Sequence, residues 1–225
     1  MRAHFSDFHM VRRTKAEAEQ TRHAVIDAAE RLFHAKGVAL TSLADIAAEA
    51  GVTRGAVYWH FKDKADIFNA MMDRVTLPLE TLVDEAVNQA SDKGHALAAL
   101  RNVTFACFTR LQQDPQMQRV FDITRNRVAY VADMLAVQQR LARTRDAFLA
   151  LTARAIAREA QQQKCSLPIA LEQAAIIMHA QIDGLVHHWL MTPGNLDLPS
   201  TASLAFENVA RGLGLKTEQW PAPAA

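Results

Sequence analysis

Cysteine, glycine and proline are all scarce in this chain of 225 residues, which has two, eight and seven of them. Two cysteines as far apart as Cys107 and Cys165 imply no disulfide framework and favour a reducing compartment. Half of the residues are hydrophobic, glycines are few, and no stretch alternates between apolar and polar residues. This composition and patterning predict an all-α fold rather than a sheet protein.

A large net charge and a long apolar run are also missing. The formal net charge is +1, so any charge that binds DNA must be clustered on one part of the chain. The start, MRAHFSDFH, lacks the apolar segment of a signal peptide, and no later stretch is long enough to span a membrane. We therefore expect a cytoplasmic protein.

Sequence patterns of common enzymes are missing as well. No Gly-rich phosphate loop follows a strand pattern, and no nucleophile elbow occurs. We expect a protein that is not an enzyme and that has no cofactor.

The stretch TSLADIAAEAGVTRGAVYWHFKDK, residues 41–64, predicts two short helices joined by a tight turn. Ser42 and Asp45 have the spacing of a capping box, and Thr53 can cap the second helix. Gly51 suits the left-handed backbone that ends the first helix. With Val57 and Phe61 facing inward, the pair of helices is typical of a helix-turn-helix unit.

The second helix of this unit presents polar and aromatic groups on its outward side. Arg54 can donate two hydrogen bonds to a guanine, and Thr53 can bind a phosphate or contact a thymine methyl group. The basic residues before the first helix either form an arm along the DNA or a disordered tail. The predicted DNA contacts are Arg12, Arg13, Lys15, Ser42, Thr53, Arg54, Gly55, Tyr58, Trp59, His60 and Lys64.

The run TSLADIAAEAGVTRGAVYWHFKDKADIF resembles the DNA-binding signature of the TetR family of bacterial transcriptional repressors. It is most similar to the AcrR-like branch, which represses multidrug efflux pumps. The segments VRRTKAEAEQTRHAVIDAAERLFHAKGV and IDGLVHHWLMTPGNLDL fit the same branch. The resemblance implies a homodimer that binds a palindromic operator and is released by a small lipophilic, drug-like effector.

Four parts of the chain follow from this organisation. Residues 1–11 are expected to be a disordered extension, residues 12–62 the DNA-binding domain, residues 63–215 the domain for ligand binding and dimerisation, and residues 216–225 a frayed tail ending in WPAPAA.

Helical stretches are expected throughout the larger domain. Asp63 and Asp66 have capping-box spacing, and Leu77–Pro78 predicts a kink or short break in the helix that follows. Further helices are expected over residues 79–91, up to 113, 116–127, up to 163, 168–191 and 200–212.

The stretch ALEQAAIIMHAQIDGLVHHWL is apolar almost all round, yet it carries His179, Asp183 and His187 at successive i, i+4 positions. Three interpretations are open: a His–Asp–His hydrogen-bond ladder, one wall of a ligand pocket, and a metal site. The metal site is disfavoured because the two histidines lie roughly 12 Å apart along a helix, so our prediction has no metal.

The resemblance to the AcrR-like branch places this stretch along the effector cavity, with Phe121 and Arg125 facing it from another helix. In that arrangement Asp183 pairs with Arg125 when no effector is bound. The predicted ligand-binding residues are Phe105, Phe108, Phe121, Arg125, Met178, His179, Ile182, Asp183 and His187.

An apolar patch for dimerisation is expected on the last two helices, because a two-fold dimer is needed to read a palindrome. Its predicted residues are Gly184, Trp189, Leu204, Phe206, Val209 and Leu213. Two alternatives remain: a regulator of the same type that senses an acyl or fatty-acid ligand, a metal or redox state through Cys165, and an architectural DNA-binding protein without effector.

Overall fold

The computed structural model describes residues 15–90, 95–129 and 134–222. Within these ranges the secondary structure is α-helical and contains no strand, which confirms the all-α prediction. The helices are α1 (Lys15–Lys36), α2 (Leu43–Glu49), α3 (Arg54–His60), α4 (Lys64–Ala90), α5 (Ala96–Gln113), α6 (Pro115–Asn126), α7 (Leu135–Gln162), α8 (Leu171–Met191) and α9 (Leu198–Gly212).

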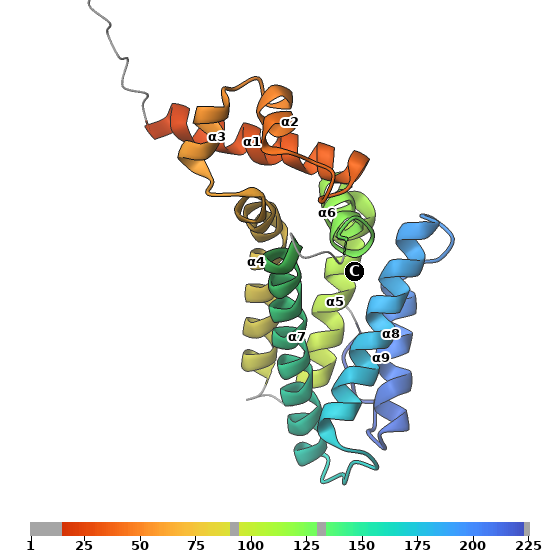
Figure 1. The fold of residues 1–225 in the computed structure, drawn as a ribbon. Coiled ribbons are helices and arrows are strands. Elements are labelled where there is room, and N and C mark those ends of the chain that lie inside the picture. Colours follow the sequence, from red (N-terminus) through yellow and green to blue (C-terminus); the bar gives the residue numbers. More distant parts are fainter. Residues whose placement is uncertain (1–14, 91–94, 130–133, 223–225) are drawn as a thin grey trace, which may run out of the picture.

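Helices α1, α2 and α3 form a small head at one end of the molecule (Figure 1). Val25, Ile26, Ala29 and Phe33 make the buried stripe of α1, and Leu32 is half-buried against the same core. The same apolar cluster also contains residues of α4, α6 and the start of α7: Ile67, Phe68, Met71, Val120, Ile123, Met134 and Val137. The core of the head is therefore completed by helices of the larger part of the molecule.

The longer helices α4, α5, α7, α8 and α9 form a bundle below the head (Figure 1). Helix α5 packs on α4, α7 and α9, and α8 packs on α7 and α9. Fully buried side chains such as Leu97, Leu100, Leu111, Ile156 and Phe206 fill this second core. Helix α6 lies between the head and the bundle (Figure 1), in contact with α1 and with α8.

Helix α4 runs on through Leu77–Pro78, where a kink or a short break is predicted, so the short break does not occur. A proline inside a helix removes one hydrogen bond and costs about 3 kcal/mol. The apolar stripe Val75, Leu79, Val83 and Val87 nevertheless keeps its i, i+4 spacing across the proline and packs on the bundle core. Burial of this stripe offsets the lost bond, and one helix joins the head to the bundle.

The start of α4 is capped much as the sequence predicts. Asp63 accepts a hydrogen bond from the Asp66 amide at 2.8 Å. The Asp66 carboxylate accepts from the Lys62 amide rather than from the amide of Asp63. This end of α4 is thus fixed to the segment that leaves α3.

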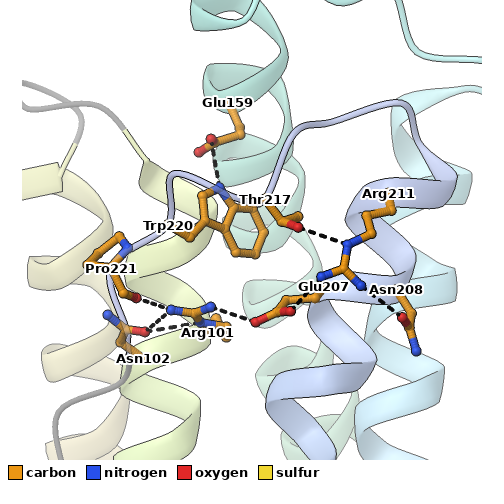
Figure 2. A network of polar contacts seen from close by, with 9 residues as sticks. All are labelled: Arg101, Asn102, Glu159, Glu207, Asn208, Arg211, Thr217, Trp220 and Pro221. Carbon is orange, nitrogen blue, oxygen red and sulfur yellow. Dashed lines mark hydrogen bonds and ion pairs between the residues drawn. The ribbon is translucent and has the colours of Figure 1, made fainter.

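The segment after α9 is packed against the bundle, where a frayed tail was expected (Figure 2). Trp220 is 7% exposed, and its indole N–H donates to the fully buried carboxylate of Glu159 at 3.1 Å. The guanidinium of Arg101 lies over the indole ring, 5.4 Å from its centre, and donates to the Pro221 carbonyl and to Glu207. Sequence rules miss this because the partners lie far away in the chain.

Candidate functional site

The turn between α2 and α3 has the geometry that its sequence predicts. The Ser42 hydroxyl accepts from the Asp45 amide and the Asp45 carboxylate accepts from the Ser42 amide, both at 3.1 Å. The two hydrogen bonds lower the pKa of Asp45. Gly51 has φ +66°, a left-handed conformation in which any other residue would be strained.

Helix α3 begins at the predicted cap. The Thr53 hydroxyl accepts from the Ala56 amide at 3.2 Å, and the Val52 amide donates to the Ala47 carbonyl at 3.0 Å. Val57 and Phe61 are 0% and 2% exposed, so both face the core of the head, as predicted. The local rules for caps and turns therefore determine which side of α3 faces outward.

The outward side of α3 carries most of the predicted DNA contacts. Thr53, Arg54 and Gly55 are exposed at the start of the helix. Tyr58 and Trp59 are 53% and 74% exposed, unusual values for aromatic side chains without a partner surface. The Trp59 ring stands edge-on to His60, with ring centres 4.5 Å apart.

Two further predicted contacts lie elsewhere on the described part of the head. Lys15 is exposed at the first turn of α1, and Ser42 is exposed while its hydroxyl caps α2. Arg12 and Arg13 lie outside the described residues.

Lys64, another predicted DNA contact, makes hydrogen bonds within the head that the sequence analysis did not predict. Its ammonium group donates to the carbonyls of Ala39 and Thr41, both at 2.9 Å, and its side chain is half-buried. Lys64 therefore fixes the segment between α1 and α2 to the start of α4.

A partly exposed charged pair joins α6 and α8. Arg125 Nη2 donates to Asp183 Oδ1 at 2.7 Å, the pairing that the resemblance implies. The guanidinium carbon of Arg125 lies 4.9 Å from the centre of the Phe121 ring, and its Nε is buried without a hydrogen-bond partner. The guanidinium is therefore held by one carboxylate and one aromatic face, and its Nε donor is unused.

His179 lies on the same side of α8 as Asp183, with its ring centre 5.2 Å from that of Phe148 on α7. Burial lowers the pKa of His179, although the carboxylate of Asp183 nearby acts in the opposite direction. His179 is therefore a neutral, half-buried imidazole at neutral pH.

The predicted stripe does not extend to His187, which is exposed on another side of α8. Residues eight positions apart are turned by about 80° around a helix, which explains the divergence. Asp183 takes its hydrogen bond from Arg125 of another helix, so a self-contained His–Asp–His ladder is not what the chain forms. In the described part of the chain, no three His, Cys, Asp or Glu side chains are grouped closely enough to hold a metal ion.

The other predicted ligand residues are largely core. Phe108, Met178 and Ile182 are 5%, 1% and 6% exposed, while Phe105 and Phe121 are half-buried. Burial also raises the pKa of the neighbouring Cys107 to about 12, so its thiol is protonated and unreactive.

In the described part of the chain, a small cavity lies between α4, α5 and α6. Its volume of about 40 Å³ is enough for a water molecule, and it is lined by Arg74, Val75, Pro78, Leu79, Arg110, Asp114, Gln116 and Met117. None of the predicted ligand residues lines it. A drug-sized effector needs several hundred Å³, which is more than this cavity offers.

The dimerisation patch requires a correction. Trp189, Phe206 and Leu213 are 4%, 0% and 4% exposed, so they belong to the core of the subunit. Gly184 is exposed, Leu204 is 57% exposed and Val209 is half-buried.

The exposed apolar residues that the sequence analysis missed on these helices are Ile176, Ile177 and Met191, at 53%, 49% and 64%. They share one stripe of α8 with Ala180 and Gly184, at spacings of three, four and seven residues. Because α8 is apolar on several sides, periodicity alone could not tell which side faces the core.

An exposed recognition-type helix on a helix-turn-helix head, set on a separate helical bundle, defines a DNA-binding transcriptional regulator with a second, sensory domain. The protein belongs to the TetR family of bacterial regulatory proteins, whose DNA-binding model matches residues 25–71. Residues 95–214 match the C-terminal region of the MAATS-type transcriptional repressors.

Known relatives are similar to this protein over most of its length. The chain is 37% identical over 190 residues to the transcriptional regulator TtgR of Pseudomonas putida, covering 84% of this chain and 89% of that protein. It is 35% identical over 203 residues to the transcriptional repressor BepR of Brucella suis, covering 90% and 96%. Both relatives are regulators rather than enzymes, in agreement with the expectation that this chain is not an enzyme.

Solved structures show the same architecture. NalD, the secondary repressor of the MexAB-OprM multidrug efflux pump in Pseudomonas aeruginosa, is 34% identical with a TM-score of 0.78, covering 88% of this chain and 98% of that one. SmeT, the repressor of the SmeDEF multidrug efflux pump of Stenotrophomonas maltophilia, is 30% identical. In complex with triclosan its TM-score is 0.75, and the match covers 92% of this chain and 96% of that one.

No helix in the described ranges is both long and apolar enough to cross a lipid bilayer.

Proposed function

We propose that this protein is a homodimeric repressor that binds a palindromic operator, controls a multidrug efflux operon, and leaves the DNA when a lipophilic drug-like effector binds its bundle. The observation that supports this most strongly is the exposed outward side of α3 on a chain whose relatives NalD and SmeT repress efflux pumps. A regulator of this kind acts in the cytoplasm, where bacterial DNA lies.

The outward side of α3 reads the operator. Arg54 and Thr53 lie at the start of the helix, where a recognition helix meets base edges in the major groove. Tyr58 and Trp59 lie one turn further on, suited to sugar and phosphate contacts that fix the register without selecting sequence. Gly55 lets the DNA approach the helix closely. Lys15, at the first turn of α1, adds a positive charge that can contact the phosphate backbone of the DNA.

Dimerisation uses the exposed apolar stripe of α8 together with Leu204 of α9. Large exposed apolar side chains such as Ile176, Ile177 and Met191 are costly in water and are typical of a protein interface. Gly184 in the same stripe lets two copies of α8 cross closely. A two-fold axis through this patch makes a four-helix interface and places two α3 helices for the two half-sites of a palindrome.

The effector binds between α6, α7 and α8, around Arg125, Asp183, His179 and Phe121. The site joins an ion pair and a neutral imidazole to aromatic rings, which suits molecules that are mostly apolar with one or two polar groups. The effector acts by shifting the protein to the conformation that it binds more tightly. DNA affinity then falls in proportion to the preference of the effector for that conformation.

An electrophoretic mobility-shift titration tests this proposal. The DNA is the region flanking the gene of this protein, and a panel of lipophilic drugs that includes triclosan is added in separate lanes. We expect sequence-specific retardation that at least one drug abolishes, and weaker retardation with Arg54→Ala. Failure of the protein to retard this DNA in preference to unrelated DNA would contradict a repressor role, and retardation that no drug alters would contradict effector control.

A further inference from the structure

A single buried acid links the head to the bundle. Glu30, on α1, is 3% exposed. Its two carboxylate oxygens each accept one hydrogen bond, from Arg119 Nε at 2.8 Å and from Gln116 Nε2 at 3.0 Å. Both donors belong to α6, so the hydrogen bonds described for this carboxylate come from a different part of the molecule.

A buried carboxylate without its partners is strongly unfavourable, because burial removes water from the charge. The favourable position of α1 is therefore the one in which Glu30 meets Arg119 and Gln116. Any rotation or shift of α6 that separates these groups must either move α1 with it or leave the charge unpaired. Glu30 thus makes the position of the head depend on that of α6.

Helix α6 is engaged on two opposite sides. Gln116 and Arg119 bind α1, whereas Phe121 and Arg125 face the effector region, where Arg125 holds Asp183 of α8. At about 100° per residue, Phe121 and Arg125 lie roughly 200° and 240° around the helix from Arg119. A helix of twelve residues, Pro115–Asn126, is short enough to move as a rigid body between these contacts.

Other contacts hold the same two helices together. The Val38 amide, just after α1, donates to the Arg127 carbonyl at the end of α6 at 3.0 Å. Asp122 lies 3.4 Å from His34 of α1 and 3.0 Å from Arg127. Val120 and Ile123 of α6 are buried in the apolar cluster of the head. Among these contacts Glu30 is the one that buries a charge, so its disruption leaves that charge without its partners.

We propose that Glu30 is the positioning residue through which α6 and the DNA-binding head control each other, in addition to the covalent connection through α4. The inference rests on the proposed function, since it requires that the head binds DNA. Movement of α6 at the Arg125–Asp183 side then changes the angle of α1 and with it the spacing of the two recognition helices. Coupling between sites is reciprocal, so binding of DNA to the head must also change α6.

This reciprocity allows a test without a known effector. The probe is a DNA duplex selected by the wild-type protein from a random-sequence library. Amide hydrogen exchange of residues 117–127 is measured by mass spectrometry with and without that duplex, in the wild-type protein and in Glu30→Gln. We expect the duplex to slow exchange in α6 of the wild type at least threefold, and to change it less than 1.5-fold in Glu30→Gln while that variant still binds the duplex.

The matched control is Glu49→Gln. Glu49 pairs with Arg31, the neighbour of Glu30 on α1, at 2.8 Å, but this pair lies within the head. Glu49→Gln must keep the wild-type response of α6. If Glu30→Gln does not fold, Arg119→Gln opens the same contact from the side of α6 and must give the same loss.

Two results would overturn the inference: no response of α6 to DNA in the wild type, or a full response in Glu30→Gln or Arg119→Gln. Either leaves the proposed repressor function intact, because the duplex still binds. If the library yields no duplex, the proposed function fails and the inference fails with it.

Discussion

Replacing Asp183 by asparagine separates the contribution of the Arg125–Asp183 pair to effector binding from its contribution to the fold. The substitution keeps the size of the side chain and one acceptor oxygen but removes the charge that holds Arg125 at 2.7 Å. We expect Asp183→Asn to remain a dimer, to bind the operator as the wild type does, and to respond differently to polar or cationic drugs.

The expected size of the stability loss follows from the solvent exposure of the two side chains. The side chains of Arg125 and Asp183 are 24% and 47% exposed, so solvent screens the pair and its loss costs about 1 kcal/mol or less. In a protein of this size that corresponds to a fall in Tm of about 2–4 °C. A hydrogen bond from a cationic ligand to the carboxylate is worth about 1.5–3 kcal/mol, so its loss weakens binding by about 10- to 150-fold.

The assay is a calorimetric titration of several drugs into both proteins, beside thermal unfolding curves. Asp84→Asn is the control, because Asp84 pairs with Arg154 at 2.7 Å with both side chains about half exposed, on the outside of α4 and α7. It should change neither drug affinity nor Tm appreciably. The reasoning is refuted if Asp183→Asn leaves every drug affinity unchanged yet lowers the unfolding free energy by several kcal/mol, since the pair would then be structural.

Three further predictions concern the head and the buried histidine. Arg54→Ala should weaken operator binding by about 1–3 kcal/mol and relax base preference, whereas Tyr58→Phe should weaken binding to all DNA alike. Fluorescence anisotropy with operator and unrelated duplexes distinguishes the two effects. Unchanged binding by both folded variants would contradict the assigned face of α3. Gly51→Ala should lower the unfolding free energy by about 1–2 kcal/mol through backbone strain alone, because no atom lies within 4 Å of the added Cβ; an unchanged denaturant midpoint would argue against this. Because burial lowers the pKa of His179 from 6.5, the unfolded chain binds the proton more readily, so the unfolding free energy should fall as the pH drops below 6.5. Denaturant melts of wild type and His179→Gln across that range measure the effect, and identical pH dependence in both would rule it out.

Local rules predicted the features of the head that depend on neighbouring residues. The caps and the turn form as the residue types require: Ser42 and Asp45 cap α2, Gly51 makes the turn, and Thr53 caps α3. Each of these features depends on residues at most four positions apart. The Arg125–Asp183 pair was predicted by family resemblance rather than by local rules, since its members are 58 positions apart.

Tertiary packing decided what the sequence could not. Trp189 and Phe206 belong to helices that are apolar on more than one side, so the pattern cannot separate core from dimer face. The orientation of Trp220 depends on Glu159 and Arg101 of distant helices, and Lys64 finds backbone carbonyls 23 and 25 positions away. Glu30 is similar: on α1 alone it reads as a solvated acid, and only the position of α6 makes it buried and paired.

The central claim is that operator and effector oppose each other through one conformational equilibrium. Fluorescence anisotropy of a labelled operator, measured with and without the most effective drug of the panel, gives the factor by which the drug weakens DNA binding. Calorimetric titration of the same drug into the free and the DNA-bound dimer gives the factor by which DNA weakens drug binding. The account predicts that both factors are well above one and equal. A drug that binds the dimer tightly and leaves both affinities unchanged would contradict it.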